Sequence, residues 1–344
     1  MNSLERCLAA IRGQPVDRTP LFPLLMFLAA DRAGLTYRRY ATDGRALAEA
    51  QLAARERYGL DAVTACSDAF RLSADLGARL SYPEQATPHA VQALVRTASD
   101  LSALRRPDPL ASGGRMADRV GAVAEMARAA GSQCLVLGWV DLPFAEACSL
   151  CGLPNVMTML YDQPVLLHRL LEFLTPIVSD FALAQLRAGA PMIGAGDAAA
   201  SLISPEFYRQ FALPYEQRVF EAVHASGGLA KLHICGNTTA HLPDLLRAGA
   251  DLYNVDHLVG FEEAARRYQA AGRAFKGNLD PAAELAFAAP QQALQEALRR
   301  IRLARQAAYP RPPRYLLSAG CEVPATVREE TFAAFCSAPR LAGS

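Results

Sequence analysis

The sequence lacks any long hydrophobic run, any excess of charge of one sign and almost all lysine. No stretch of the 344 residues approaches the roughly 18 uninterrupted apolar positions of a membrane-spanning helix. The 35 basic and 34 acidic side chains leave a net charge of +1, so neither nucleic acid nor an anionic membrane is an expected partner. Only Lys231 and Lys276 are lysines, a bias that, with the abundant alanine, we attribute to genome base composition.

The sequence predicts neither a secretory leader nor a disulfide framework. The segment Met1–Pro15 carries charges and has no continuous apolar core, unlike a signal peptide. Eight cysteines are scattered along the chain without dense clustering, which is typical of thiols in a reducing compartment. We therefore expect a cytoplasmic protein. An apolar share of 51% is enough for a large core and excludes a disordered or fibrous chain.

Short apolar runs alternate with amphipathic segments along the whole chain. Buried parallel strands have this length and these Gly, Pro or Asp boundaries. The expected strands are Pro20–Phe27, Ala62–Cys66, Cys134–Val140, Met192–Gly196, Leu229–Cys235, Leu252–Val255, Ala274–Gly277 and Tyr315–Ala319. Helical spacing marks Arg45–Tyr58, Ala240–Ala248 and Pro290–Gln306, and Ser204 has the character of a helix N-cap.

Eight such units predict an α/β fold, a single (β/α)₈ barrel spanning residues 1–344 as one domain. We also expect extra N-terminal helices, and an insertion at about residues 67–133 between the second and third strands. A doubly wound open sheet is the alternative. It is disfavoured because no Gly-rich phosphate loop follows the first strand.

Polar, ligating or titratable side chains follow seven of the eight runs, and only the first run ends in apolar residues. Barrel enzymes carry their catalytic groups at these strand ends. The residues are Asp68, Trp139 with Asp141, Asp197, His233 with Cys235, Asp256 with His257, Asn278 with Asp280, and Cys321 with Glu322.

The sharpest motif is Leu232–Asn237, which reads LHICGN. Residues two apart in an extended segment share a side, so His233 and Cys235 can face one site, and Cys321 ends the last strand at the same mouth. One imidazole and two thiolates suit zinc, and three protein ligands leave a fourth position open, as in catalytic sites. Burial of Cys321 in the core remains the alternative. For Cys148 and Cys151, a lone Cys-x-x-Cys pair, core packing is the favoured interpretation.

The chain resembles the uroporphyrinogen decarboxylase superfamily, a (β/α)₈ barrel family, over nearly its whole length. The resemblance rests on Leu4–Pro23, Arg38–Leu52, Arg57–Asp68, Ala199–Tyr215, Leu232–Asn237, Gly277–Pro281 and Ser318–Pro324.

Two branches of that superfamily imply different functions. The decarboxylases carry an Arg-Gln-Ala-Gly-Arg-Tyr motif after the first strand, whose arginines bind tetrapyrrole carboxylates. The matching stretch Phe22–Leu35 lacks those arginines, although Asp68 matches the decarboxylase aspartate. The corrinoid-linked methyltransferases carry a His-x-Cys…Cys zinc motif, which His233, Cys235 and Cys321 match. The resemblance therefore implies Zn²⁺ as cofactor and methyl transfer from a methylcorrinoid protein to a small thiol.

Further roles follow from this resemblance and from the strand-end positions. Asp68, Asp197 and Asp256 are candidate catalytic residues, and we expect Asp256 to fill the open metal position before the thiol arrives. Candidates for contacts with the cofactor or its ligands are Trp139, Asn237, Asn278 and Glu322. Asn237 is also a candidate cap for a helix beginning near Thr238. The sequence leaves open whether the protein forms a homodimer. A metal-free tetrapyrrole decarboxylase and a non-catalytic corrinoid-binding protein are the alternative functions.

Overall fold

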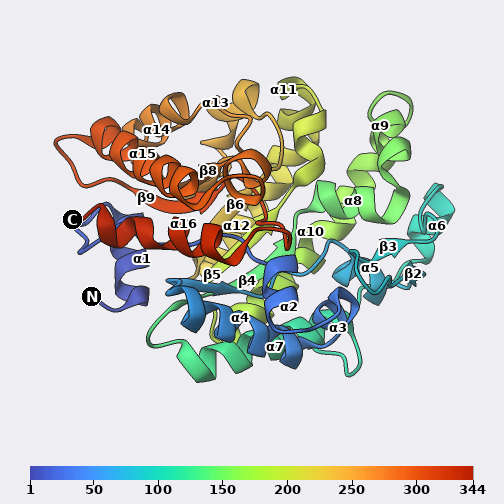
Figure 1. Ribbon diagram of the computed structural model, residues 1–344. Helices are drawn as coiled ribbons and strands as arrows, with labels where there is room; N and C mark the ends of the chain where they lie inside the picture. Colours follow the sequence, from blue (N-terminus) through green and yellow to red (C-terminus); the bar gives the residue numbers. More distant parts are fainter. Residues whose placement is uncertain (344) are drawn as a thin grey trace.

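A computed structural model describes residues 1–343 of the chain. Its main sheet has seven parallel strands in the order β1-β4-β5-β6-β7-β8-β9 (Figure 1). Their bounds are β1 (Ala62–Thr64), β4 (Leu135–Asp141), β5 (Met192–Gly196), β6 (Leu229–His233), β7 (Leu252–Asn254), β8 (Ala274–Leu279) and β9 (Tyr315–Ala319). Each contains mostly buried residues, as expected for strands covered on both faces.

The segment around Leu21 closes this sheet into a barrel. The Phe22 amide donates to the Leu317 carbonyl at 2.9 Å, and the Leu317 amide donates to the Pro20 carbonyl at 2.8 Å. On the other side, the Asp61 amide donates to the Leu21 carbonyl at 2.9 Å. The predicted first strand is therefore present as isolated bridges to β9 and the loop after it, with a hydrogen bond on the β1 side, and the (β/α)₈ barrel is confirmed.

Helices surround the barrel and precede it. The α-helices are α1 (Ser3–Arg12), α2 (Phe27–Arg32), α3 (Tyr37–Thr42), α4 (Gly44–Tyr58), α5 (Arg71–Asp75), α6 (Ala98–Ala103), α7 (Arg115–Ala130), α8 (Pro143–Cys151), α9 (Leu153–Asp162), α10 (Pro164–Arg187), α11 (Pro205–Phe207), α12 (Leu213–Ala225), α13 (Leu242–Leu245), α14 (Phe261–Ala270), α15 (Pro290–Ala308) and α16 (Glu329–Leu341). Shorter 3₁₀ and π turns are η1 (Ala198–Leu202), η2 (Tyr208–Ala212), η3 (Thr239–His241) and η4 (Pro281–Ala286). Within residues 1–343, no helix combines the length and apolarity that a bilayer crossing requires.

Local signals explain where several helices begin and end. The Asp43 side chain accepts from the Ala46 amide at the start of α4, and Gly59 ends that helix in a left-handed conformation. Ser204 caps α11 by accepting from the Phe207 amide, as predicted. The helix predicted over residues 240–248 is shorter than expected, because the chain forms η3 and α13 and then turns before Gly249, whose φ is 93°.

The insertion between β1 and β4 holds α5, the small hairpin of β2 (Leu80–Ser81) and β3 (His89–Ala90), α6 and α7. The hairpin and α6 lie at the edge of the molecule beyond α5 and α8 (Figure 1). His89 and Ala90 also line the large cavity of the barrel mouth, so the insertion contributes to the site.

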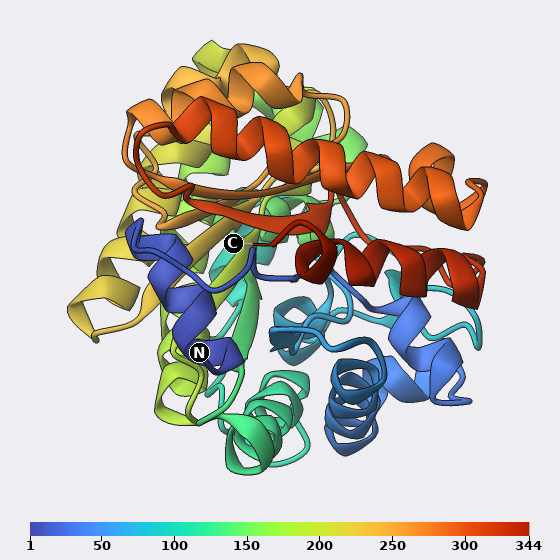
Figure 2. The same ribbon diagram turned by 60° about the vertical axis from the view of Figure 1, so that its left-hand side comes forward.

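Helix α1 covers the opposite end of the barrel (Figure 2). Its Cys7, Ala10 and Ile11 join one apolar cluster with residues that begin the strands, among them Leu135 and Met192. The amino-terminal end of the barrel is thereby filled with apolar side chains. We therefore look for functional side chains at the other end of the barrel, where the strands finish.

Candidate metal centre

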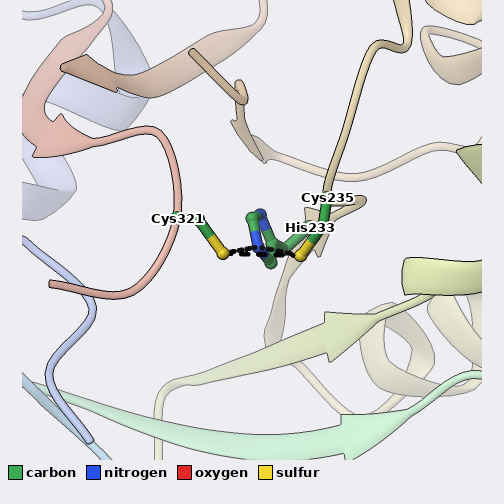
Figure 3. A group of neighbouring side chains, drawn as sticks. All are labelled: His233, Cys235 and Cys321. Carbon is green, nitrogen blue, oxygen red and sulfur yellow. Dashed lines mark hydrogen bonds between the residues drawn. The ribbon is translucent and has the colours of Figure 1, made fainter. Parts of the chain in front are cut away.

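His233, Cys235 and Cys321 lie together at the carboxyl end of the barrel (Figure 3). Cys235 Sγ is 3.1 Å from His233 Nε2 and 3.5 Å from Cys321 Sγ, and Cys321 Sγ is 3.6 Å from His233 Nε2. His233 ends β6 and Cys235 follows it, whereas Cys321 follows β9. The structure thus brings together three side chains that lie as much as 88 positions apart in the sequence.

These distances fit one face of a tetrahedral zinc site. Zinc bonds of about 2.3 Å to sulfur and about 2.0–2.1 Å to nitrogen place neighbouring tetrahedral ligands about 3.5–3.8 Å apart. The observed separations of 3.1–3.6 Å need shifts of only about half an ångström to reach those values. One imidazole and two thiolates therefore form a donor set that suits zinc, with a fourth position free of protein ligands.

The loop after β7 bridges the two strands that supply these donors. Strand β7 adjoins β6, whereas β9 lies two positions further along the sheet. Asp256 Oδ2 accepts from the Gly236 amide at 2.9 Å, and this bond fixes the turn next to Cys235. On the other side, Asn254 donates to the Gly320 carbonyl at 3.0 Å, next to Cys321.

Glycine is required at position 320 because the two loops approach closely. A Cβ atom added there would lie 2.3 Å from the His257 amide nitrogen, a backbone atom that cannot move aside by itself. Only a residue without a side chain lets the β9 loop pack against the β7 loop at this distance. The position of Cys321 therefore depends on Gly320.

The two thiols do not ionise alike. Hydrogen bonds from Cys235 and from His233 stabilise the Cys321 thiolate, and they lower the pKa of Cys321. The same Cys321 thiolate, together with burial, raises the pKa of Cys235. Cys321 is thus the sulfur of the pair that loses its proton more easily, and the thiolate is the form that a metal ion binds.

A cavity of about 640 Å³ opens onto the three donors, and all three belong to its wall. That volume is within the ordinary range of small-molecule sites. Apolar side chains make up most of the remaining wall, and they include Leu24, Met26, Phe70, Trp139, Leu153 and Leu202. The open side of the donor triangle therefore faces a space with room for a substrate.

Asp68 lines the same cavity, but its carboxylate is already bound on all sides. Arg115 donates to both oxygens at 2.9 Å, and Ser67 Oγ and the Phe70 amide donate at 2.7 and 2.9 Å. Although burial opposes ionisation, Arg115 and these hydrogen bonds lower the pKa of Asp68 to about 2. The carboxylate thus holds the loop after β1 through four hydrogen bonds, and its catalytic role stays a prediction.

A second buried ion pair lies beside the first. Arg71 donates to Asp141, and burial still raises the pKa of Asp141 to about 6. Arg71 is 1% exposed, and its Nε and Nη1 have no partner among the described residues. Neither Arg71 nor Arg115 belongs to the cavity wall. Each acid therefore stands between the cavity and its own arginine.

Asp197 is fully buried behind the cavity wall, where its amide donates to the His233 carbonyl at 3.0 Å. Burial, and after it the neighbouring Glu216, raise the pKa of Asp197 well above its usual value. Burial also raises the pKa of Glu216 to about 7, and Tyr208 donates to this carboxyl group. Asp197 supports β6 from behind and does not reach the metal-site face.

The remaining predicted residues divide into two groups. Trp139 and Glu322 line the cavity, and Glu322 accepts from the Phe27 amide at 2.6 Å. Asp256, Asn237 and Asn278 do not line it. Asp256 stands outside the three-residue donor group, which corrects the expectation that it fills the open metal position.

Asn237 and Asn278 both contact backbone or neighbouring side chains. Asn237 Oδ1 accepts from the Thr239 amide at 3.1 Å, the capping role that the sequence offered as an alternative. Asn278 lies inside β8, because the strand extends past the predicted Gly277. Its amide donates to the carbonyls of Asp256 and Val259, which corrects its assignment to cofactor binding.

Sequence reasoning gave no role to Lys231, which lies two residues before His233 on the same side of β6. Its ammonium is fully buried without a hydrogen-bond partner in the described chain, 4.5 Å from the centre of the Trp139 ring. Burial lowers the pKa of Lys231 to about 8. A lysine within an apolar strand, in a chain with only two lysines, was the available signal.

Comparison with known proteins agrees with this architecture. The family model described as "Uroporphyrinogen decarboxylase (URO-D)" matches residues 2–340. The chain belongs to the uroporphyrinogen decarboxylase family. Relatives of this family include uroporphyrinogen decarboxylases from Nocardia farcinica, 35% identical over 78% of this chain and 75% of that protein, and from Ralstonia pickettii, 32% identical over 86% and 83%.

Solved structures share the fold of this family member. A methyltransferase from Methanosarcina mazei superposes with a TM-score of 0.87 at 22% identity, and the match covers 99% of both chains. A B12-independent methionine synthase from Shewanella superposes with a TM-score of 0.61 at 11% identity, covering 95% of this chain and 97% of that one. At these identities the likeness concerns the fold.

Proposed function

We propose that this member of the family is a zinc-dependent methyltransferase that moves a methyl group from a methylcorrinoid protein to a small thiol. The observation that carries the proposal is the triangle of His233, Cys235 and Cys321, whose donor atoms lie within 4.8 Å of one another and face a cavity of about 640 Å³. A site that only stabilised the fold would normally supply a fourth protein ligand.

The chain's own residues have defined tasks in this proposal. His233 Nε2 and the sulfurs of Cys235 and Cys321 would hold the ion, while Asp256 and Gly320 keep the two loops in register. When bound, zinc would act as a Lewis acid that lowers the pKa of the acceptor thiol and keeps its sulfur nucleophilic at neutral pH. No strong general base is then needed, which agrees with the bound state of Asp68.

The transfer itself balances without a further reactant. The acceptor thiol gives its proton to solvent, its sulfur forms a bond to the methyl carbon, and the cobalt–carbon bond of the donor breaks with the electron pair left on cobalt. The apolar wall around Trp139 and Leu24 would keep water from the methyl group. Leu153 and Leu202, which are 38% and 62% exposed, form an apolar rim against which a corrinoid protein would dock.

A tetrapyrrole decarboxylase is the second candidate, favoured by the names of the curated relatives at 35% and 32% identity. A tetrapyrrole with several carboxylates needs fixed cations in its site. In the described part of the chain, neither arginine nor lysine belongs to the cavity wall, and the Asp68 carboxylate is occupied by Arg115. These observations disfavour the decarboxylase.

Two measurements on the purified protein separate the candidates. Elemental analysis with X-ray absorption at the zinc edge should find one zinc per chain bound by two sulfurs, one nitrogen and one lighter atom. Methylcobalamin and a thiol should then yield the methyl thioether. A protein without zinc that decarboxylates uroporphyrinogen would overturn the proposal. A protein that binds a corrinoid but turns nothing over would instead support a non-catalytic role.

A further inference from the structure

Acidic side chains form part of the cavity wall, whereas the arginines nearest to them lie behind it. The wall includes the acids Asp68, Asp141 and Glu322, whereas the nearest arginines, Arg71 and Arg115, lie behind the wall. Between residues 1 and 343, the basic side chains of the wall are the metal-site His233 and the exposed His89 on the β3 hairpin. No guanidinium or ammonium group belongs to the described wall, and the Lys231 ammonium lies fully buried beneath it, against the Trp139 ring.

An anionic substrate would therefore find no partner in this space. Arg115 already donates hydrogen bonds to both oxygens of Asp68, and Arg71 donates to Asp141. The unpartnered Nε and Nη1 of Arg71 are themselves buried and do not reach the cavity. A carboxylate or sulfonate taken into an apolar cavity without a cation loses its hydration and gains nothing in return.

A cationic substrate has little advantage either. The carboxylate of Asp68 makes four hydrogen bonds, and that of Asp141 is bound to Arg71, so both acids are already neutralised by fixed charges. Glu322 receives the Phe27 amide on one oxygen. Among the described residues Glu322 has no cationic partner, so apolar contact with Trp139, Leu24 and Phe70 is the main interaction left for a substrate but not the sole one.

We propose that the methyl acceptor is an uncharged, largely apolar thiol, and that this cavity discriminates against thiols with an anionic tail. The inference rests on the proposed function for the role of the thiol, but the charge preference of the cavity is a property of its wall alone. Both parts are tested separately below.

The first test uses the wild-type protein with cobalt(II) in place of zinc. We would titrate four thiols of similar length, 1-propanethiol, 2-mercaptoethanol, 2-aminoethanethiol and 3-mercaptopropionate, and follow the thiolate-to-cobalt absorption band. Dissociation constants are corrected for the pKa of each thiol. We expect 1-propanethiol to bind at least tenfold more tightly than 3-mercaptopropionate. Equal or tighter binding of 3-mercaptopropionate or 2-aminoethanethiol would overturn the inference and leave the proposed function intact.

The second test needs no metal. Trp139 is the only tryptophan of the chain and lines the cavity, so its fluorescence reports occupancy directly. 1-Hexanol and hexanoate would be titrated against the wild type and against Cys235→Ser. Half-maximal change at a hexanol concentration at least tenfold below that of hexanoate supports the inference, even if no thiol alters the cobalt spectrum and the proposed function fails. A preference for hexanoate overturns it.

Discussion

Two walls of the same cavity differ in whether their polar side chains are paired with a counter-charge. On the side of β6, β7 and β9, the donor atoms of His233, Cys235 and Cys321 face one another and have no counter-charge of their own. On the side of β1 and β4, the charged groups of Asp68 and Asp141 are each paired with an arginine. The first wall is therefore where we propose that a metal ion binds, because its donor atoms contact one another and no counter-charge.

The comparison shows why a titratable residue at a strand end is not enough to mark a catalytic group. Asp68 and Cys321 both end barrel strands and both line the cavity. The carboxylate of Asp68 has four hydrogen bonds, whereas the sulfur of Cys321 has only the other two donors nearby. A carboxylate whose hydrogen bonds are all made stabilises the fold, whereas a cysteine sulfur with few other partners can bind a metal ion.

The largest expected effect comes from removing a donor of the first wall. Cys235→Ser and Cys321→Ser should each reduce bound zinc from one per chain to almost none, because a hydroxyl is a much poorer zinc ligand than a thiolate. Zinc content measured after gel filtration checks this. Cys148→Ser is the matched control, since Cys148 lines the same cavity outside the donor group and should leave zinc in place.

Removing the Arg71–Asp141 ion pair from the second wall should lower the free energy of unfolding and leave the zinc content unchanged. Arg71→Met leaves Asp141 buried without its cation, which should lower the free energy of unfolding by about 3–5 kcal/mol. Arg38→Met removes an exposed ion pair with Glu84 and should cost about 0–1 kcal/mol. Urea denaturation and zinc analysis test both. Loss of zinc in a folded Arg71→Met protein would show that the two walls are not independent.

A smaller effect is expected where the loops of the first wall meet. In Gly320→Ala the new Cβ would clash with the His257 amide nitrogen, so the β9 loop must shift. We expect about 1–3 kcal/mol of destabilisation and weaker zinc binding. Gly260→Ala has open space around the new Cβ and is the control. Thermal denaturation with zinc titration would contradict this account if Gly320→Ala matched the control.

The last effect, smallest when expressed per pH unit, is a pH dependence of stability that originates behind the cavity walls. Because burial raises the pKa of Glu216 from about 4.5 to about 7, the unfolded chain ionises first as the pH rises. Between those values the free energy of unfolding should therefore fall with rising pH, by at most about 1.4 kcal/mol per pH unit from this group. Below about 4.5 the group adds no pH dependence.

Glu216→Gln should make the fall between pH 5 and pH 7 shallower, because the amide stays uncharged and can still accept from Tyr208, while Asp141 and Asp197 keep part of the fall. The measurement is urea denaturation at pH 5, 6 and 7. Glu221→Gln, an exposed change on the same helix α12, should leave the slope as it is in the wild type. An unchanged slope in Glu216→Gln would assign the pH dependence to another group.

Local sequence patterns were enough to predict the barrel and the three residues that meet in the donor triangle. Apolar runs of four to eight residues predicted the strands because a strand buried on both faces must be apolar along its length. The spacing of His233 and Cys235 predicted a shared side because alternation is a local property of extended backbone. Cys321 could be added because all parallel strands of a barrel end at one mouth.

Only the tertiary structure decided which strand-end residues are free to act. Whether Asp68 is catalytic depends on Arg115, 47 positions away, and whether Asp256 is a ligand depends on the Gly236 amide, 20 positions away. No sequence period encodes such pairings, because they arise when loops from different strands meet. The same reason applies to Gly320, whose role depends on the His257 backbone, and to Arg71 and Arg115, which pair with the acids of the cavity wall from behind it.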